Sequence, residues 1–201
     1  MRLTIMRHGA TEANLAHRYE GARTDSPLCE QGVQQCRRIN GGLLPTDVRK
    51  VYTSTMLRAR QTARLCFPLA RVVQTPHLEE FDFGVFEGRT ANQMENDNLY
   101  RMWVESGCVD PCPNGDTLYD YTARTAHTVA KLLLESTDRG EQDVVVVAHN
   151  GTIMATLWEL AASQHRRQGP FDWHAPNCGG YQAEVRIAND SVELVNPRAF
   201  K

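Results

Sequence analysis

The chain has 201 residues, about the size of one to one and a half typical domains, so a single core can bury most of its apolar surface. Its 22 Lys and Arg residues against 24 Asp and Glu residues give a formal net charge of -2, which argues against a nucleic-acid or polyanion binder. A hydrophobic share of 41% and a charged share of 23% are ordinary for a globular protein and exclude a disordered chain. We expect one domain over residues 1–201.

The sequence contains no segment suited to a membrane. The longest apolar run, Val144 to Ala148, is far shorter than the roughly 20 residues of a spanning helix. Arg7 and His8 interrupt the N-terminus before a signal-peptide core could form. The six cysteines are scattered without a paired framework, and a chain of this length does not depend on disulfides. We therefore expect a cytoplasmic protein with free thiols and no membrane partner.

Apolar, β-branched runs alternate with helical patterns along the chain. Residues Val144 to Val147 lack polar alternation, which indicates a strand buried on both faces, as in a parallel sheet covered by helices. The pattern predicts an α/β fold, a three-layer α/β/α sandwich with a mostly parallel central sheet. In chain order, the expected elements are strand Leu3–Met6, helix Glu30–Asn40, strand Val48–Thr53, helix Leu57–Cys66, strand Ala70–Gln74, helix Asn92–Ser106, helix Thr117–Leu134, strand Asp143–Ala148, helix Thr152–Ala162, and strands Tyr181–Ile187 and Val192–Val195.

Polar side chains follow four of these strands. Arg7 and His8 come directly after the first strand, Arg58 lies shortly after the second, Glu80 follows the third, and His149 follows the fourth. Because ligands of open α/β sheets bind beyond the carboxyl ends of the strands, we expect these side chains to meet at one edge of the sheet. Each position alone is a weak signal, since a histidine after a strand is more often structural than catalytic.

The combination is more informative than its members. Arg7 and Arg58 beside two histidines would be costly near a buried edge unless an anion neutralised them. The planar fork of arginine donors suits phosphate oxygens, and Asn14 can add an amide donor. The sequence therefore predicts a phosphate-binding site.

Four sequence blocks carry a family resemblance. They are Arg7-His8-Gly9-x-Thr11-x-x-Asn14 with Pro27-Leu28-x-x-x-Gly32, then Ser54-x-x-x-Arg58-Ala59-x-Gln61-Thr62-Ala63, then Leu78-x-Glu80-x-x-x-Gly84-x-x-Glu87-Gly88, and finally His149-Asn150-Gly151. In this order they resemble the motifs of the histidine phosphatase superfamily, which includes the cofactor-dependent phosphoglycerate mutases. The first block alone would be weak evidence, whereas four ordered blocks over residues 3–152 are strong. The resemblance implies a phosphoglycerate mutase-like fold.

The resemblance also implies a role for each matched residue. His8 would be the nucleophile that forms a phosphohistidine, and Glu80 would be the general acid and base. A neutral His8 needs an acceptor for its second ring nitrogen, which we expect to be a backbone carbonyl. No metal and no cofactor are implied, because fixed cations around phosphorus can stabilise the charge of the transition state. The phosphoryl group and substrate would be held by Arg7, Arg58, His149, Asn14, Thr11 and Asn150.

Some assignments rest on spacing alone. Glu79 and Asp82 are acids adjacent to Glu80, and only the motif spacing selects Glu80 among them. The segment Glu20–Ser26 is one residue longer than in many relatives, so we expect the loop that covers the substrate to differ. At Asn150 many relatives have glycine.

Three further features could suggest other sites. Cys108 and Cys112 could form half of a zinc site, yet no matching pair of ligands follows at zinc spacing. The basic run His165–Arg167 is better explained as a solvated helix end. Trp173 and His174 could reach the mouth of the pocket, although aromatic residues before a strand usually pack a core.

The sequence thus predicts a metal-independent phosphomonoesterase that acts on a small phosphorylated metabolite, such as α-ribazole phosphate or a sugar phosphate, as a monomer or homodimer. One alternative is a cofactor-dependent phosphoglycerate mutase. Another, of a different class, is a catalytically silent module that binds a phospho-ligand. The run from Gly88 to Pro113 is short, with Arg89 and Arg101 as its cations, and the tail after His149 is short too. Both favour a hydrolase, because a mutase needs a closed pocket and cations for a second charged group.

Overall fold

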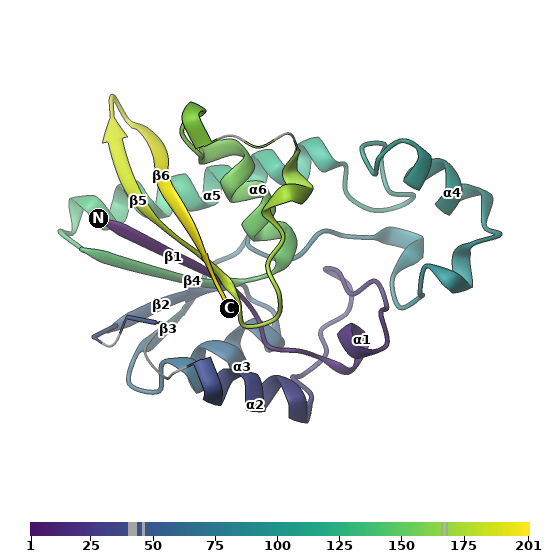
Figure 1. The fold of residues 1–201 in the computed structure, drawn as a ribbon, viewed down its shortest axis with the longest axis horizontal. Helices are drawn as coiled ribbons and strands as arrows, with labels where there is room; N and C mark the ends of the chain where they lie inside the picture. Colours follow the sequence, from purple (N-terminus) through teal and green to yellow (C-terminus); the bar gives the residue numbers. More distant parts are fainter. Residues whose placement is uncertain (40–43, 46, 166, 168) are drawn as a thin grey trace.

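A six-stranded mixed sheet forms the middle of the molecule (Figure 1). The computed structural model describes residues 1–39, 44–45, 47–165, 167 and 169–201. The strand order is β3-β2-β4-β1-β5-β6, with parallel pairing from β3 to β1 and antiparallel pairing of β5 with both of its neighbours. The strands are β1 (Arg2–Arg7), β2 (Lys50–Thr53), β3 (Arg71–Gln74), β4 (Asp143–Ala148), β5 (Gly180–Ala188) and β6 (Ser191–Phe200).

Helices cover both faces of the sheet, with α5 and α6 on one side and α2 and α3 on the other (Figure 1). Alternate side chains of β4 enter the two layers: Val144 and Val146 pack with α5 and α6, whereas Val145 and Val147 pack with α2 and α3. The predicted α/β fold with helical layers around the sheet is confirmed. The α-helices are α1 (Glu12–Leu15), α2 (Glu30–Ile39), α3 (Leu57–Cys66), α4 (Asn98–Glu105), α5 (Leu118–Asp138) and α6 (Asn150–Leu160).

The register of the parallel strands brings their carboxyl ends to a common edge. Arg7 at the end of β1 pairs with Ala148 at the end of β4, and Thr53 at the end of β2 pairs with Val147. The residues that follow are therefore neighbours in space although they are far apart in sequence. A shift of one residue would turn every side chain of a strand to the opposite face, which the two apolar layers forbid.

Most predicted elements agree with the structure, but the predicted helix Asn92–Ser106 is wrong. A 3-10 turn covers Asn92–Met94, and α4 begins only after Asp97. The reason is a local cap, because the Asp97 carboxylate accepts a hydrogen bond from Leu99 N at 3.1 Å and starts a new helix there. The predicted helix Glu30–Asn40 is described to Ile39, and Asn40 lies outside the described residues. The short helix α1 was not predicted.

A third hydrophobic cluster lies beyond the edge of the sheet, around α4 (Figure 1). Phe86, Tyr100 and Trp103 are buried there, with ring centroids 5.4 to 6.2 Å apart. Tyr121 of α5 belongs to the same cluster and joins it to the rest of the core.

Among the helices in the described ranges, none has the length and apolar character needed to cross a membrane.

Candidate active site

His8 lies directly after β1, where its backbone N–H continues the strand pairing to Ala148 O at 2.9 Å. Its ring Nδ1 is 2.7 Å from Gly9 O. Because a carbonyl can only accept, Nδ1 carries the hydrogen and Nε2 keeps a lone pair. The predicted backbone acceptor for the second ring nitrogen is thus Gly9 O. Burial lowers the pKa of His8 well below its usual value, and the charges of Arg58 and Arg7 lower it further. The ring is therefore neutral at neutral pH.

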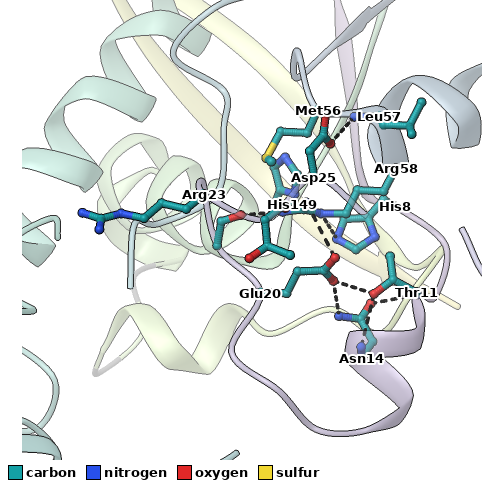
Figure 2. A network of polar contacts seen from close by, with 12 residues as sticks. His8, Thr11, Asn14, Glu20, Arg23, Asp25, Met56, Leu57, Arg58 and His149 are labelled. Carbon is teal, nitrogen blue, oxygen red and sulfur yellow. Dashed lines mark hydrogen bonds and ion pairs between the residues drawn. The ribbon is translucent and has the colours of Figure 1, made fainter. Parts of the chain in front are cut away.

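Arg58 lies in the first turn of α3 and is completely buried. Its Nε is 3.3 Å from His8 Nε2 (Figure 2). Its two terminal nitrogens donate to backbone carbonyls of the preceding loop, Nη1 to Thr24 O at 2.6 Å and Nη2 to Gly21 O at 3.1 Å. The same loop is fastened to α3 by Asp25, whose carboxylate accepts from Leu57 N at 2.6 Å. Loop and helix together fix the guanidinium beside the histidine.

His149 follows β4 and faces His8 across the site, with ring centroids 5.2 Å apart. Its Nε2 is 2.8 Å from Ser54 Oγ, which follows β2. Burial, then Arg58, His8 and Arg7, lower the pKa of His149 well below its usual value, so this ring too is neutral at neutral pH. Its Nδ1 is buried and has no hydrogen-bond partner among the described residues.

Arg7 ends β1, and its Nη1 donates to Ala175 O at 3.1 Å. Burial lowers its pKa, an effect that Glu80 and Glu20 oppose. Its Nε is buried without a partner in the described part of the chain, like Nδ1 of His149. Buried polar groups are nearly always hydrogen-bonded, so two such atoms in one site indicate a place for a polar ligand.

Thr11 and Asn14, both predicted to bind substrate, lie at the start of α1 and contact a carboxylate in this structure (Figure 2). Thr11 Oγ1 donates to Glu20 Oε2 at 2.5 Å, and Asn14 Nδ2 donates to the same oxygen at 3.1 Å. Glu20 Oε1 lies 3.9 Å from Arg58 Nη1 and has no hydrogen bond to the described residues. Glu20 was not assigned from the sequence, where its only signal is an acid in the loop beside the first motif.

Glu80 lies beyond β3 and is buried, with both carboxylate oxygens held by donors. Oε1 accepts from Phe81 N at 2.9 Å and from the hydroxyl of Tyr121 at 3.0 Å, and Oε2 accepts from Gly151 N at 3.2 Å. Burial and then Glu80 raise the pKa of Tyr121 well above its usual value, so its hydroxyl remains a donor. A Cβ on Gly151 would lie 2.1 Å from Glu80 Oε1, so any other residue there would displace the carboxylate. The supporting role of Tyr121 was not predicted.

The site therefore joins two neutral histidines, two arginines and a carboxylate at the carboxyl edge of the sheet. The Histidine phosphatase superfamily (branch 1) profile matches residues 3–196. The chain belongs to this superfamily. The predicted family and enzyme class are thereby confirmed.

Named relatives of this histidine phosphatase include both hydrolases and mutases. It is 30% identical over 199 residues to the adenosylcobalamin/alpha-ribazole phosphatase of Salmonella typhimurium, covering 94% of this chain and 96% of the relative. It is also 30% identical over 169 residues to a 2,3-bisphosphoglycerate-dependent phosphoglycerate mutase of Azorhizobium caulinodans, covering 79% and 80%. A solved structure of a putative alpha-ribazole-5'-P phosphatase from Escherichia coli superposes with a TM-score of 0.80, at 25% identity and 96% and 94% coverage.

Glu79 and Asp82, the two acids adjacent to Glu80 in the sequence, form their contacts away from His8 and His149. Glu79 accepts from Thr55 Oγ1 at 2.5 Å, and Asp82 forms an ion pair with Arg23 at 2.8 Å. Figure 2 shows the Arg23 side chain pointing away from the network around His8. Asp82 and Glu79 are thus held by partners of their own, whereas Glu80 is held at Gly151, two residues after His149.

Asn150, the remaining predicted substrate-binding residue, begins α6 and is already engaged. Its Oδ1 accepts from Ala175 N at 2.9 Å, and its Nδ2 is 2.9 Å from Met154 Sδ. It thereby fastens the segment before β5, which also supplies the carbonyl partner of Arg7. The same segment contains Trp173 and His174, which were considered for the mouth of the pocket. Trp173 is buried in the core, whereas His174 lines a cavity.

This cavity, which we call the aromatic cavity, has a volume of about 540 Å³ and adjoins Glu80. It lies between the cluster around α4 and the helices α5 and α6. The aromatic residues of the cavity wall are Tyr19, Phe81, Phe83, Trp103, Tyr121 and Phe171.

No group of three or more His, Cys, Asp or Glu side chains that could hold a metal ion occurs in the described ranges.

Proposed function

We propose that the chain is a phosphomonoesterase, acting as a single domain, that hydrolyses a small phosphorylated metabolite through a phosphohistidine on His8. The observation that carries this proposal is the lone pair of a neutral, buried His8 Nε2 beside Arg58 Nε. Two buried nitrogens without a partner among the described residues, Arg7 Nε and His149 Nδ1, mark where the phosphoryl oxygens would be received. This set of groups supplies donors around phosphorus without a metal or a cofactor.

The first step forms the phosphoenzyme. In the free site the lone pair of His8 accepts a hydrogen bond from Arg58 Nε, and as substrate binds a phosphoryl oxygen replaces His8 as the acceptor. His8 Nε2 then attacks phosphorus, and the bond from phosphorus to the alkoxide oxygen breaks in line. Glu80 gives its proton to that oxygen, and the alcohol leaves. Arg7, Arg58 and His149 stabilise the charge on the three equatorial oxygens.

The second step returns the enzyme to its starting state. Glu80, now a carboxylate, takes a proton from water, and the water oxygen attacks phosphorus as the bond to His8 breaks. Inorganic phosphate leaves, and Glu80 again carries a proton. Tyr121 and the backbone N–H of Gly151 hold the carboxyl group in one position through both steps. Positioned acids and bases of this kind contribute about 10²- to 10⁴-fold to the rate.

The substrate class follows the names of the relatives, which include alpha-ribazole phosphatases, and the chemistry of the site. We propose a small phosphate ester such as α-ribazole phosphate or a sugar phosphate, handled by a monomer or homodimer. A mutase would also have to hold the second charged group of its bisphosphorylated intermediate. No Lys or Arg occurs among the described residues that line the aromatic cavity beside Glu80, which favours the hydrolase. A silent binding module would not need Glu80 and the lone pair of His8 together.

The test is to compare wild type with His8→Ala on p-nitrophenyl phosphate and to trap the phosphoenzyme with labelled substrate. We expect release of inorganic phosphate, an acid-labile and base-stable phosphoenzyme, and loss of both in His8→Ala. His127→Ala is the matched control, because His127 is an exposed histidine of α5. Most of the activity remaining in His8→Ala would contradict the mechanism. Fast isomerisation of 3-phosphoglycerate in the presence of 2,3-bisphosphoglycerate, with negligible phosphate release, would establish the mutase instead.

A further inference from the structure

The aromatic cavity touches the reaction at one group, Glu80, which forms part of its wall. Under the proposed function, Glu80 protonates the oxygen through which the leaving alcohol was attached to phosphorus. The carbon skeleton behind that oxygen must therefore extend from Glu80, and the aromatic cavity is the space that begins there. Its volume of about 540 Å³ lies within the range of ordinary small-molecule sites, which is roughly 300 to 1,000 Å³.

The wall of the aromatic cavity offers apolar surface. Besides its six aromatic residues, it includes Leu118 and Met154. The hydroxyl groups that it contains already have protein partners: Tyr19 pairs with Tyr100 at 2.9 Å, and Thr122 donates to Tyr119 O at 3.1 Å. The many hydroxyl groups of a sugar would lose their hydration there without gaining partners, at a cost in free energy for each.

The wall offers no cation to an anionic leaving group. Glu80 is the one acidic residue of the wall, and no Lys or Arg lines it among the described residues. Burial, and then the charge of Arg7, lower the pKa of His174, so this ring is neutral at neutral pH. The cations Arg7 and Arg18 line a separate polar hollow, which shares Tyr19 and His174 with the aromatic cavity but does not include Glu80.

One donor of the wall has no partner. Trp103 is 5% exposed, and its Nε1 is buried without a hydrogen bond to any described residue. A buried N–H of this kind is costly unless a ligand supplies an acceptor. The indole ring itself lines the cavity, where an aromatic ligand could stack on it and on the other rings of the wall.

We propose that the aromatic cavity binds the leaving alcohol and selects one that carries an uncharged aromatic or heteroaromatic ring. This inference rests on the proposed phosphatase activity and narrows its substrate class. An aromatic ring offers the apolar faces that the wall can cover, and it needs no cation. A carboxylate or second phosphate on the leaving group would instead require the charges of the polar hollow.

The test compares three substrates whose leaving oxygens have nearly the same basicity: propyl phosphate, 3-phenylpropyl phosphate and 4-carboxybutyl phosphate. We expect kcat/KM for the phenyl ester to exceed that of the propyl ester by about 10- to 100-fold, the effect of burying a phenyl group. The carboxylate ester should be the poorest substrate. Equal values for propyl and phenylpropyl esters, or a preference for the carboxylate, would overturn the inference. No phosphate release from any ester or from p-nitrophenyl phosphate would instead overturn the proposed function.

A pair of variants locates the effect. Leu118 lines the aromatic cavity at the start of α5, and its neighbour Tyr119 is 79% exposed and does not line it. Both Leu118→Asp and Tyr119→Asp place an acid in the first turn of α5, where the helix dipole favours it. We expect the phenylpropyl to propyl ratio of kcat/KM to fall at least 5-fold in Leu118→Asp and to stay within 2-fold of wild type in Tyr119→Asp. An unchanged ratio in Leu118→Asp, or equal losses in both variants, would overturn the assignment of the aromatic cavity.

Discussion

Replacing Glu20 by Gln should tighten the binding of oxyanions to the histidine site. The Glu20 carboxylate lies 3.9 Å from Arg58 Nη1, and its oxygen on that side has no hydrogen bond to the described residues. A phosphoryl group bound to Arg58 must therefore share the guanidinium with a second anion. Gln has nearly the same shape, and its carbonyl oxygen can accept the hydrogen bonds that Thr11 and Asn14 now donate to Glu20.

The size of the effect can be worked from this geometry. Two anions that each lie about 4 Å from one guanidinium are about 7 Å apart, and two unit charges at that distance repel by about 2 kcal/mol at an effective dielectric of 20. Removing one charge should therefore strengthen binding of a singly charged oxyanion by about 30-fold. Relaxation of the loop around Glu20 would reduce this, so we take about 10-fold as the lower bound.

The assay is the inhibition constant of vanadate against p-nitrophenyl phosphate, together with calorimetric titration of inorganic phosphate. We expect both ligands to bind at least about 10-fold more tightly to Glu20→Gln than to wild type. Glu12→Gln is the matched control, because Glu12 is an exposed acid of the neighbouring helix α1, and it should change neither constant by more than 2-fold. Unchanged or weaker binding in Glu20→Gln would refute the electrostatic reasoning.

Four further predictions concern the same site. Tyr121→Phe removes a hydrogen bond to Glu80 and should lower kcat for alkyl phosphates by about 10-fold or more, but less for p-nitrophenyl phosphate, in steady-state assays of both. Gly151→Ala should be worse in the same assays, since its Cβ would displace Glu80. The folded state keeps His8 and His149 neutral, whereas the unfolded chain binds their protons below about pH 6.5. The unfolding free energy should therefore fall below that pH, by up to about 1.4 kcal/mol per unit for each histidine, in urea titrations without phosphate. EDTA should leave phosphatase activity intact; a loss restored by zinc or magnesium would contradict the proposed metal independence.

The sheet and its active edge were predictable from local patterns. The apolar run of β4 requires helices on both faces, and parallel strands so covered must end at a common edge, where His8 and His149 follow. The break at Asp97 was not predictable, because a capping acid and a helix-interior acid look alike until the chain path is known. Tyr121 was missed for a related reason. Helical periodicity places it on a buried face of α5, but only the docking of α5 brings its hydroxyl to Glu80.

Arg58 owes its position to main-chain atoms. The carbonyls of Gly21 and Thr24 accept hydrogen bonds from its terminal nitrogens, and every amino acid has the same backbone carbonyl group. Side-chain replacements can therefore leave the guanidinium in place at loop positions other than Gly21, where a Cβ would lie 2.1 Å from Phe81 O, and Asp25, which fastens the loop to α3. Adding or removing a residue between these carbonyls would move at least one of them away. When related sequences are compared, the length of this loop should therefore be more informative about the arginine than the identity of most of its residues. The length determines where the two carbonyls, and with them the guanidinium, are placed.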